Sequence, residues 1–405
     1  MSGDQARARA CAAALASLAG MTPVRLAALV AGWTPEDAWA RVVAGSHPRD
    51  PDRRFAAGAR GVDPMAVAER YARSGISVLV PDDSRYPASL RGDPGAPAVL
   101  FSAGDPSVLT DRPAVAVVGT RSATPYGRQV SAELGRDLAS AGVAVVSGLA
   151  LGIDGAAHAG ALGAGATGAP PAGVVATGLD VPYPPAHRQL WQAVAARGVV
   201  LSEAPLGAPP RRGRFPARNR IVAGLSDVVV VVECHRRGGS IYTAEAAARR
   251  SIPVGAVPGS VRSPASAGTN ALLADGCFPV RDADDVLVAV SLARRRVDRP
   301  APMPSAAVPV EARERVSRPR TRCSARGALP SAPTEGTTEA TVLAALDAEP
   351  TPVEVLALRT GLALGELARA AHHLVADGWA VAGDGWWSAR HPGPSQASPE
   401  RRGGR

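Results

Sequence analysis

Residues 113–162 read PAVAVVGTRSATPYGRQVSAELGRDLASAGVAVVSGLALGIDGAAHAGAL, and two valine-rich runs stand out in them, at 114–118 and 143–146. Short, continuously apolar runs of this kind are typical of strands that are buried on both faces of a sheet. Helical spacing over 126–141 and over 154–162 predicts a helix after each strand. A strand–helix–strand unit predicts parallel pairing with a crossover helix.

The same alternation continues to residue 293. Further strands are expected at 174–176, 199–201, 228–232, 254–257 and 278–280, and further helices at 187–196, 217–225, 241–250, 270–275 and 283–292. This order predicts an α/β, Rossmann-like, doubly wound fold with a mainly parallel sheet over residues 81–293. Ligands of such folds bind beyond the carboxyl ends of the strands.

Smaller domains are predicted on both sides of this core. Residues 8–75 show helical spacing, which predicts a helical domain over 1–80. Within it, LAGMTPVRLAALVAGW at 18–33 resembles a SAM-like or helix-hairpin-helix unit, which either binds DNA or protein or simply packs. Residues 338–391 predict a winged helix, with helices at 340–346, 352–359 and 364–377 and a hairpin turned at Gly383-Asp384-Gly385. A basic, proline-rich linker at 294–337 and a tail at 392–405 are predicted to be disordered.

The composition excludes several enzyme classes. All 45 basic residues are arginine, against 36 acidic residues, for a net charge of +9. Without lysine the chain can form no P-loop, no kinase strand lysine, no pyridoxal Schiff base and no SxxK system. The charge is uneven, because the linker carries ten arginines and four acids whereas the core carries 19 arginines and 17 acids. The linker is either a weak phosphate-binding segment or a solvated spacer.

The cysteines and the hydropathy favour a cytoplasmic protein without a cofactor. Cys11, Cys234, Cys277 and Cys323 are scattered, without metal-ligand spacing, and are expected to be reduced thiols. No metal site is expected. No apolar run approaches about 18 residues, so no membrane span is expected. The N-terminus is a poor signal peptide, because Asp4 precedes an apolar run that continues into an amphipathic pattern.

Glycine-containing turns follow the first two strands. In the first, Gly119, Thr120 and Arg121 precede a helix, where free amides and the helix dipole favour an anion and Arg121 adds a bidentate phosphate donor. A tight turn with a surface arginine is an equally good interpretation. In the second turn, Ser147, Gly148 and Gly152 allow close approach by a ligand. Two further residues of this turn have structural interpretations: Asp154 as a helix cap and His158 as a packed side chain.

Two later segments add arginines, an aromatic ring and hydroxyl groups. Residues 209–220 read PPRRGRFPARNR, a rigid basic loop suited to a single strand. Its candidate contacts are Arg212, Phe215, Arg218, Asn219 and Arg220. A further turn offers Gly239, Ser240 and Thr243 at a helix start, as an anion nest. Without a nucleophile–base pair or a carboxylate cluster, the pattern indicates a bound chain of phosphates and no catalysis.

Taken in order, these motifs resemble the DprA/Smf family of DNA-processing proteins over about residues 85–290. The resemblance rests on VAVVGTRSATPYG, VVSGLALGIDGAAHAGAL, GLDVPYPPAH, LSEAPLGAPPRRGRFPARNRIVAGLSDVVVVVEC, GGSIYTAEAA and VPGSVRSPASAGTNALLADG. It implies a single-stranded DNA-binding protein that protects incoming DNA, forms a homodimer through its core and delivers RecA recombinase in natural transformation, without enzyme activity. It also implies DNA contacts for the candidate residues named above.

The chain departs from the family pattern at three places. Tyr183-Pro184 is followed by Pro185 where the family has asparagine, Gly238 replaces the first serine of SGSxxTA, and 164–172 resembles an inserted loop.

The sequence is also compatible with two other functions. Gly238 to Glu245 is distantly similar to the signature of nucleotide phosphoribohydrolases, in which Glu245 would stabilise a ribosyl cation. A sequence-specific regulator acting through the winged helix is disfavoured, because residues 338–391 carry three arginines and seven acids. A protein-contact role for that domain is the preferred hypothesis.

Overall fold

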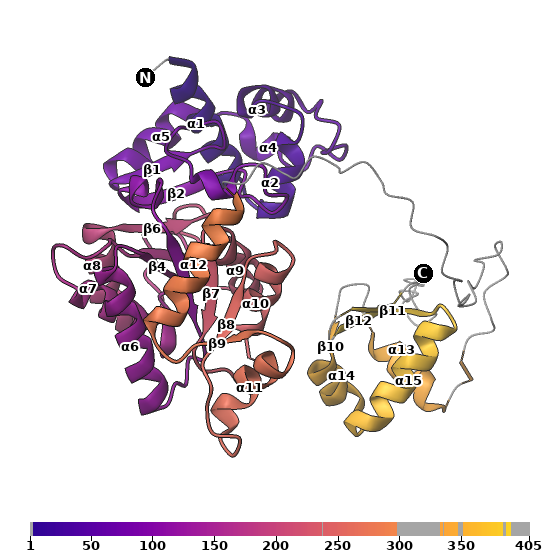
Figure 1. The fold of residues 1–405 in the computed structure, drawn as a ribbon. Coiled ribbons are helices and arrows are strands. Elements are labelled where there is room, and N and C mark those ends of the chain that lie inside the picture. Colours follow the sequence, from indigo (N-terminus) through magenta and orange to yellow (C-terminus); the bar gives the residue numbers. More distant parts are fainter. Residues whose placement is uncertain are drawn as a thin grey trace, which may run out of the picture. The chain divides into compact units, whose positions relative to one another are not determined.

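The computed structural model describes residues 3–236, 238–297, 333–334, 336–346, 351–383 and 386–389. The chain divides into two compact units, Met1–Ala306 and Ala307–Arg405 (Figure 1). Most of the predicted linker, Cys323, the Asp384-Gly385 turn and the predicted tail lie outside the described residues.

A nine-stranded sheet forms the centre of the first unit, in the order β1-β2-β6-β5-β4-β3-β7-β8-β9. The strands are β1 (Ile76–Leu79), β2 (Leu100–Gly104), β3 (Ala114–Val118), β4 (Ala144–Ser147), β5 (Ala172–Val175), β6 (Val199–Ser202), β7 (Val228–Val231), β8 (Val254–Ala256) and β9 (Phe278–Pro279). Neighbouring strands from β6 across to β9 pair in parallel, whereas β2 pairs antiparallel with both β6 and β1. The predicted mainly parallel α/β sheet is confirmed, with two antiparallel strands at one end, β1 and β2, that the sequence did not predict.

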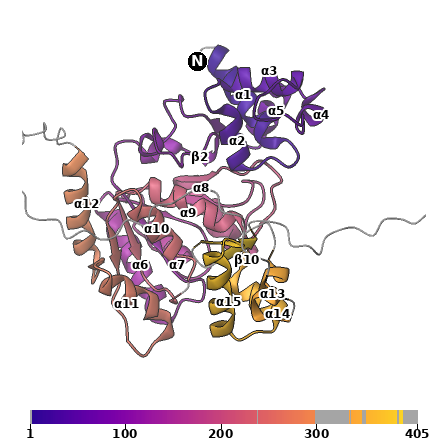
Figure 2. The ribbon, with the colours of Figure 1, turned by 90° about the vertical axis from the view of Figure 1, so that its right-hand side faces the viewer.

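Alternate residues of the central strands face different helices. Val115 and Val117 share a core with α6 (Pro125–Ser140), α7 (Ile153–Gly163) and α12 (Ala283–Val297). Ala114 and Ala116 share another core with α9 (Arg214–Gly224) and α10 (Ile241–Ala248). Because successive side chains of a strand point to opposite faces, helices cover both faces of this sheet, as Figures 1 and 2 show. Two further helices are α8 (Arg188–Arg197) and α11 (Ala267–Ala274).

Five helices precede the sheet: α1 (Gly3–Ser17), α2 (Pro23–Val30), α3 (Pro35–Ala44), α4 (Ala56–Ala59) and α5 (Pro64–Arg73). Three of them begin at a proline whose preceding Thr22, Thr34 or Asp63 side chain caps the helix. These helices share a core with β1, β2 and α8, in which the Tyr71 and Phe101 rings stack with centroids 4.7 Å apart. The N-terminal helices therefore pack directly on the β1–β2 side of the sheet.

The strand order reverses at β3. From β3 the chain adds β4, β5 and β6 on one side and then returns to β7, β8 and β9 on the other. In doubly wound sheets the crevice beyond the carboxyl ends of the strands at such a reversal is the usual ligand site. The turns after β3, β4 and β7 therefore meet at one place.

Three helices and a small sheet make up the second unit. The helices are α13 (Thr338–Ala345), α14 (Val353–Thr360) and α15 (Leu364–Ala376), and the strands are β10 (Thr351–Pro352), β11 (Ala380–Gly383) and β12 (Trp386–Ala389). The strands pair antiparallel in the order β10-β12-β11 around a core that includes Val342, Leu356 and Leu367. The predicted hairpin is present as β11 and β12, and β10 is an additional strand.

Candidate nucleic-acid interface

A cavity of about 350 Å³, here called the switch-point cavity, lies beyond the carboxyl ends of β3, β4 and β7. Segments from all four predicted motifs line it. Ten of the predicted site residues are in its wall: Gly119, Thr120, Arg121, Gly148, Phe215, Arg218, Asn219, Gly239, Ser240 and Thr243. The fold thus brings together residues that are more than 120 positions apart in the sequence.

An exposed arginine and an aromatic ring form one part of the wall. The Arg121 guanidinium carbon lies 4.7 Å from the centroid of the Phe215 ring, and the Tyr183 ring lies 5.7 Å from that of Phe215. Among the described residues Arg121 has no acidic partner, so its charge is available to a ligand. Arg121 and Phe215 also line a second cavity of about 50 Å³, to which Tyr183 contributes. A guanidinium beside an aromatic face suits a phosphate next to a base.

Arg218 brings a buried positive charge to the switch-point cavity. Its side chain is only 6% exposed, and its Nη1 donates a hydrogen bond to the Val174 carbonyl. Its Nε has no hydrogen-bond partner in the described part of the chain. Burial lowers the pKa of Arg218, and the nearby Asp154 carboxylate opposes this shift. Because a buried ion needs compensation, an anionic ligand in the cavity would stabilise this side chain.

Gly148 and Asp154 both adapt the turn after β4 to Arg218. A Cβ atom at Gly148 would collide with the Arg218 guanidinium, so the missing side chain makes room for this arginine. Asp154 accepts a hydrogen bond from the Gly148 amide at 3.1 Å. The prediction that Asp154 caps its helix is wrong, because α7 has no side-chain cap and Asp154 lies inside its first turn. Consequently the Gly148 amide is already bonded and is not free for a ligand.

Ser240 places a buried hydroxyl on the same cavity. It lies at the N-terminus of α10, is 6% exposed, and forms a side-chain hydrogen bond with Cys234 that lowers the pKa of this thiol against the larger effect of burial. Asn219 donates from its side-chain amide to the Gly239 carbonyl at 3.1 Å, which ties α9 to this turn. Buried polar groups are normally paired in native proteins. The unpaired Nε of Arg218 on this cavity therefore indicates a site for an anion.

Glu233 holds the turn after β3, a role that none of the sequence motifs predicts. Its carboxylate accepts hydrogen bonds from the Thr124 amide at 2.9 Å and the Thr124 hydroxyl at 2.5 Å. Its carbonyl accepts from the Thr120 amide at 2.8 Å. Glu233 is buried and lies 109 residues after Thr124. It thus fixes both ends of the segment that carries Arg121.

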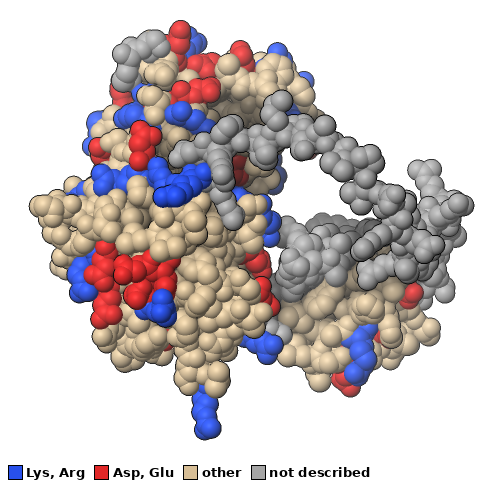
Figure 3. Space-filling view, in the orientation of Figure 1, with Lys and Arg blue, Asp and Glu red and all other residues tan. Residues whose placement is uncertain are grey.

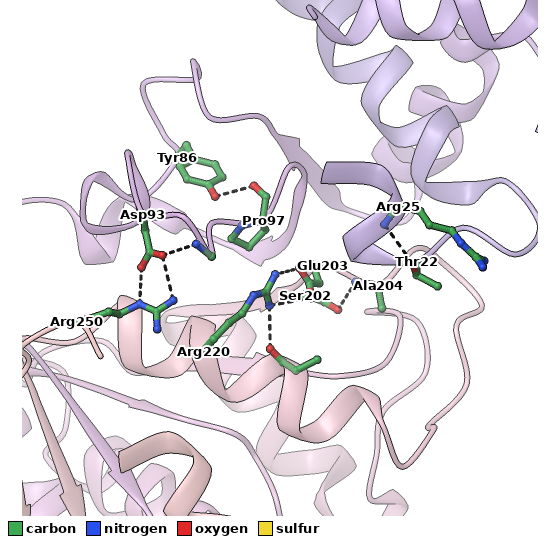
Figure 4. A network of polar contacts seen from close by, with 12 residues as sticks. Thr22, Arg25, Tyr86, Asp93, Pro97, Ser202, Glu203, Ala204, Arg220 and Arg250 are labelled. Atoms are coloured by element: carbon green, nitrogen blue, oxygen red, sulfur yellow. Dashed lines mark hydrogen bonds and ion pairs between the residues drawn. The ribbon is translucent and has the colours of Figure 1, made fainter. Parts of the chain in front are cut away.

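Four predicted site residues do not line the switch-point cavity. The Ser147 hydroxyl donates to the Val117 carbonyl at 2.6 Å, so it joins two strands. Gly152 has a φ of 78°, and a Cβ there would meet the carbonyl oxygens of Thr120 and Arg121, so it allows two turns to pack. Arg212 is exposed. Arg220 forms two hydrogen bonds with the Glu203 carboxylate, at 2.6 and 3.0 Å (Figure 4).

Arginine and acidic side chains are mixed on the face of the molecule that Figure 3 draws. Figure 3 shows arginine and acidic side chains in small separate groups over the face that it draws. Among the residues that the structure describes, no group of three or more His, Cys, Asp or Glu side chains is arranged to hold a metal ion. No described helix is long and apolar enough to span a membrane.

The fold and the site define an α/β protein with a Rossmann-like sheet and a site for an anionic ligand at the strand-order reversal. Residues 77–291 match the family described as DNA recombination-mediator protein A. The chain belongs to this family, and the resemblance to DprA/Smf proteins is confirmed.

Relatives support the same assignment. A putative DNA processing protein DprA from Mycobacterium tuberculosis is 42% identical over 231 residues, which are 54% of this chain and 59% of the relative. The match therefore spans less than two thirds of that relative's length. Protein Smf from Synechocystis is 32% identical over 316 residues, which are 76% of this chain and 78% of the relative. The X-ray structure of DprA from Streptococcus pneumoniae superposes with a TM-score of 0.60 at 32% identity, over 67% of this chain and 95% of that chain.

Proposed function

We propose that the switch-point cavity binds single-stranded DNA without sequence preference and without chemistry on the strand. The observation that carries the proposal is the placement of Arg121, which has no acidic partner among the described residues, against the Phe215 ring. The unpaired Nε of Arg218 lies in the same wall. In this arrangement phosphates are bound by Arg121 and Arg218, and a base stacks on Phe215.

The proposal favours a single strand over a duplex. In a duplex each base face is covered by its neighbours, so a ring such as Phe215 has no base to stack on. Stacking accepts every base, because each has a π face. Binding should therefore vary little with sequence and fall steeply with salt.

Fluorescence anisotropy with labelled homopolymer strands and with a duplex of the same length tests this function. We expect tight binding to each strand, within a few-fold of one another, and weak binding to the duplex. A duplex bound as tightly as its separate strands would contradict the proposal.

We further propose that the protein has the cellular role that the resemblance to DprA/Smf proteins implies. The protein would protect incoming DNA and load RecA recombinase in natural transformation, as a homodimer formed through the core. This role places it in the cytoplasm, in keeping with three free thiols in the described residues. Faster RecA assembly on a strand in the presence of the protein, and a dimer mass by sedimentation, are the expected results.

We also propose roles for the flanking regions, with 1–80 as a SAM-like or helix-hairpin-helix-like domain, 81–293 as the binding core and 338–391 as a winged helix. The last carries more acids than arginines, which disfavours DNA and favours a protein contact. Basic residues in the linker at 294–337 would contribute to DNA binding only weakly and without sequence preference.

A phosphoribohydrolase is not favoured as the alternative. Glu245 would need to reach the ribose of a bound nucleotide, yet it is not among the described residues that line the switch-point cavity. Incubation with nucleoside monophosphates is expected to release no base. Base release that Glu245→Gln abolishes would overturn the assignment as a binding protein.

A further inference from the structure

A groove of about 770 Å³ lies between the N-terminal helices and the core. On one side it is lined by residues 16–23 together with Arg25 and Leu26, from the end of α1 to the start of α2. On the other side it is lined by the segment that follows β6, including Glu203, Arg211 and Arg214. Figure 4 shows Thr22 and Arg25 at the start of α2 beside Glu203 and Ala204. We call this feature the interdomain groove.

Its charged groups favour an anion. Arg25 donates to the Gly20 carbonyl at 2.7 Å and Arg214 donates to the Pro209 carbonyl at 3.2 Å, so both bond to backbone only. Within the described chain neither these two arginines nor Arg211 forms an ion pair. The one acid in the groove wall, Glu203, already holds Arg220 at 2.6 Å. The groove therefore presents three arginines that form no ion pair in the described chain, beside one acid that is already paired with Arg220.

The interdomain groove lies next to the site described above. It shares Val175, Ala176 and Arg218 with the small cavity beside Tyr183, and Arg218 also lines the switch-point cavity. The interdomain groove and the switch-point cavity are therefore neighbours that have Arg218 in common. The rest of the wall is largely apolar and includes Leu18, Met21, Leu26 and Leu206. A basic groove with apolar walls suits a backbone with unstacked bases.

We infer that the interdomain groove holds the continuation of the bound single strand, and that Arg25 of the N-terminal helices contacts one of its phosphates. The inference rests on the proposed function, and it extends the binding site beyond the Rossmann-like core. The N-terminal helices then do more than pack on the sheet, because they increase the number of nucleotides that the protein covers. Binding should improve with strand length until the strand reaches Arg25.

A length series of oligothymidine, from about 4 to about 16 nucleotides, tests this inference. Arg25→Ala is expected to leave the affinity for the shortest strand unchanged and to weaken the longest by about threefold to tenfold. For the long strand the slope of log affinity against log salt should fall by about 0.7, the value for one phosphate contact on a single strand. Arg25→Gln, which retains a donor for Gly20, should reproduce the loss of slope.

The matched control is Arg73→Ala, which removes an exposed arginine at the end of α5 that does not line the groove. It should bind both lengths like the wild type. Equal affinity of Arg25→Ala and wild type for the long strand, or an equal loss at both lengths, would overturn the inference. Failure of the proposed function looks different, because Arg121→Ala would then bind every length as the wild type does. Circular dichroism and thermal melting confirm that each variant is folded.

Discussion

Arg121 and Arg218 line the same cavity but differ in their exposure to solvent. Arg121 is exposed and touches Phe215, whereas Arg218 is buried beside Asp154 and bonds to the Val174 carbonyl. Removing Arg121 should therefore affect binding alone. Removing Arg218 should also lower stability, because it leaves the buried Asp154 carboxylate without its cation. Substitutions of Arg121 are accordingly the cleaner probe of DNA contact.

The Phe215 ring is expected to stack on a base. Phe215→Ala should cost about 1–3 kcal/mol of binding free energy for a single strand, since that is the range for one base on one aromatic ring. Phe215→Tyr is the matched control, because it retains the ring and should bind within a few-fold of wild type. Anisotropy titrations of both variants measure this, and an unchanged affinity in Phe215→Ala would exclude stacking at this position.

A buried histidine should make the protein acid-sensitive. His158 is fully buried, and burial lowers its pKa from 6.5 to about 4, against the opposing effect of a hydrogen bond with the Ser147 backbone. As the pH falls, the unfolded chain binds this proton before the folded one does. The free energy of unfolding should therefore fall between about pH 6.5 and pH 4, by at most about 1.4 kcal/mol per pH unit.

His158→Met is expected to remove this part of the acid sensitivity. Urea unfolding at several pH values measures it, and His235→Met, which changes an exposed histidine of the same unit, serves as the control. A variant at position 158 that is destabilised by acid as steeply as the wild type would show that other groups are responsible.

Among the elements, the strands from β3 to β9 were predictable because each is a short apolar run bounded by turn residues. The antiparallel strands β1 (Ile76–Leu79) and β2 (Leu100–Gly104) were not, because antiparallel pairing with a distant strand leaves no local pattern in segments that contain serine and glycine. The strand-end turns were predicted to meet because parallel strands end at one edge. The pairing of Glu233 with Thr124 spans 109 residues and has no local signal.

The role of Arg218 in the site likewise could not be predicted from the sequence. Residues 209–220 contain five arginines that the sequence does not distinguish, and only the fold buries one of them against Gly148. Arg220, which is two residues after Arg218 in the sequence, pairs with Glu203 instead. The motif thus located the loop but not the separate roles of its arginines.

Glu233 is expected to support both the stability of the fold and the position of the turn that carries Arg121. Glu233→Ala would leave the Thr124 amide without its acceptor, at a cost of about 1–3 kcal/mol in the free energy of unfolding. It should also weaken DNA binding, because the turn that carries Arg121 loses its anchor. Glu233→Gln retains one acceptor and should lose less of both. Unfolding and binding are measured on the same preparations, and wild-type binding by a destabilised Glu233→Ala would contradict the positioning role.

For the whole molecule, net charge says little about the ligand. Much of the excess of +9 lies in the segment 294–337, and the core has nearly equal numbers of arginines and acids. Binding instead depends on where unpaired arginines lie, in the switch-point cavity and in the interdomain groove. Both features belong to the first unit, Met1–Ala306.

Deleting residues 338–405 should therefore leave the affinity for single strands close to that of the full chain. The deletion removes every described helix and strand of the second unit but none of the residues that line either cavity. Anisotropy on the truncated and full chains measures the difference. A loss as large as that caused by Arg121→Ala would assign DNA contact to the second unit.

The most direct test of the central claim is the salt dependence of single-strand binding by the wild type and by Arg121→Ala. Arg121→Ala should bind more weakly, and its slope of log affinity against log salt should be smaller by about 0.7, as expected for one lost phosphate contact. Arg136→Ala, in which an exposed arginine paired with Asp137 is removed from α6, should keep the wild-type slope. Identical affinities and slopes for the wild type and Arg121→Ala would contradict the assignment of the switch-point cavity as the DNA site.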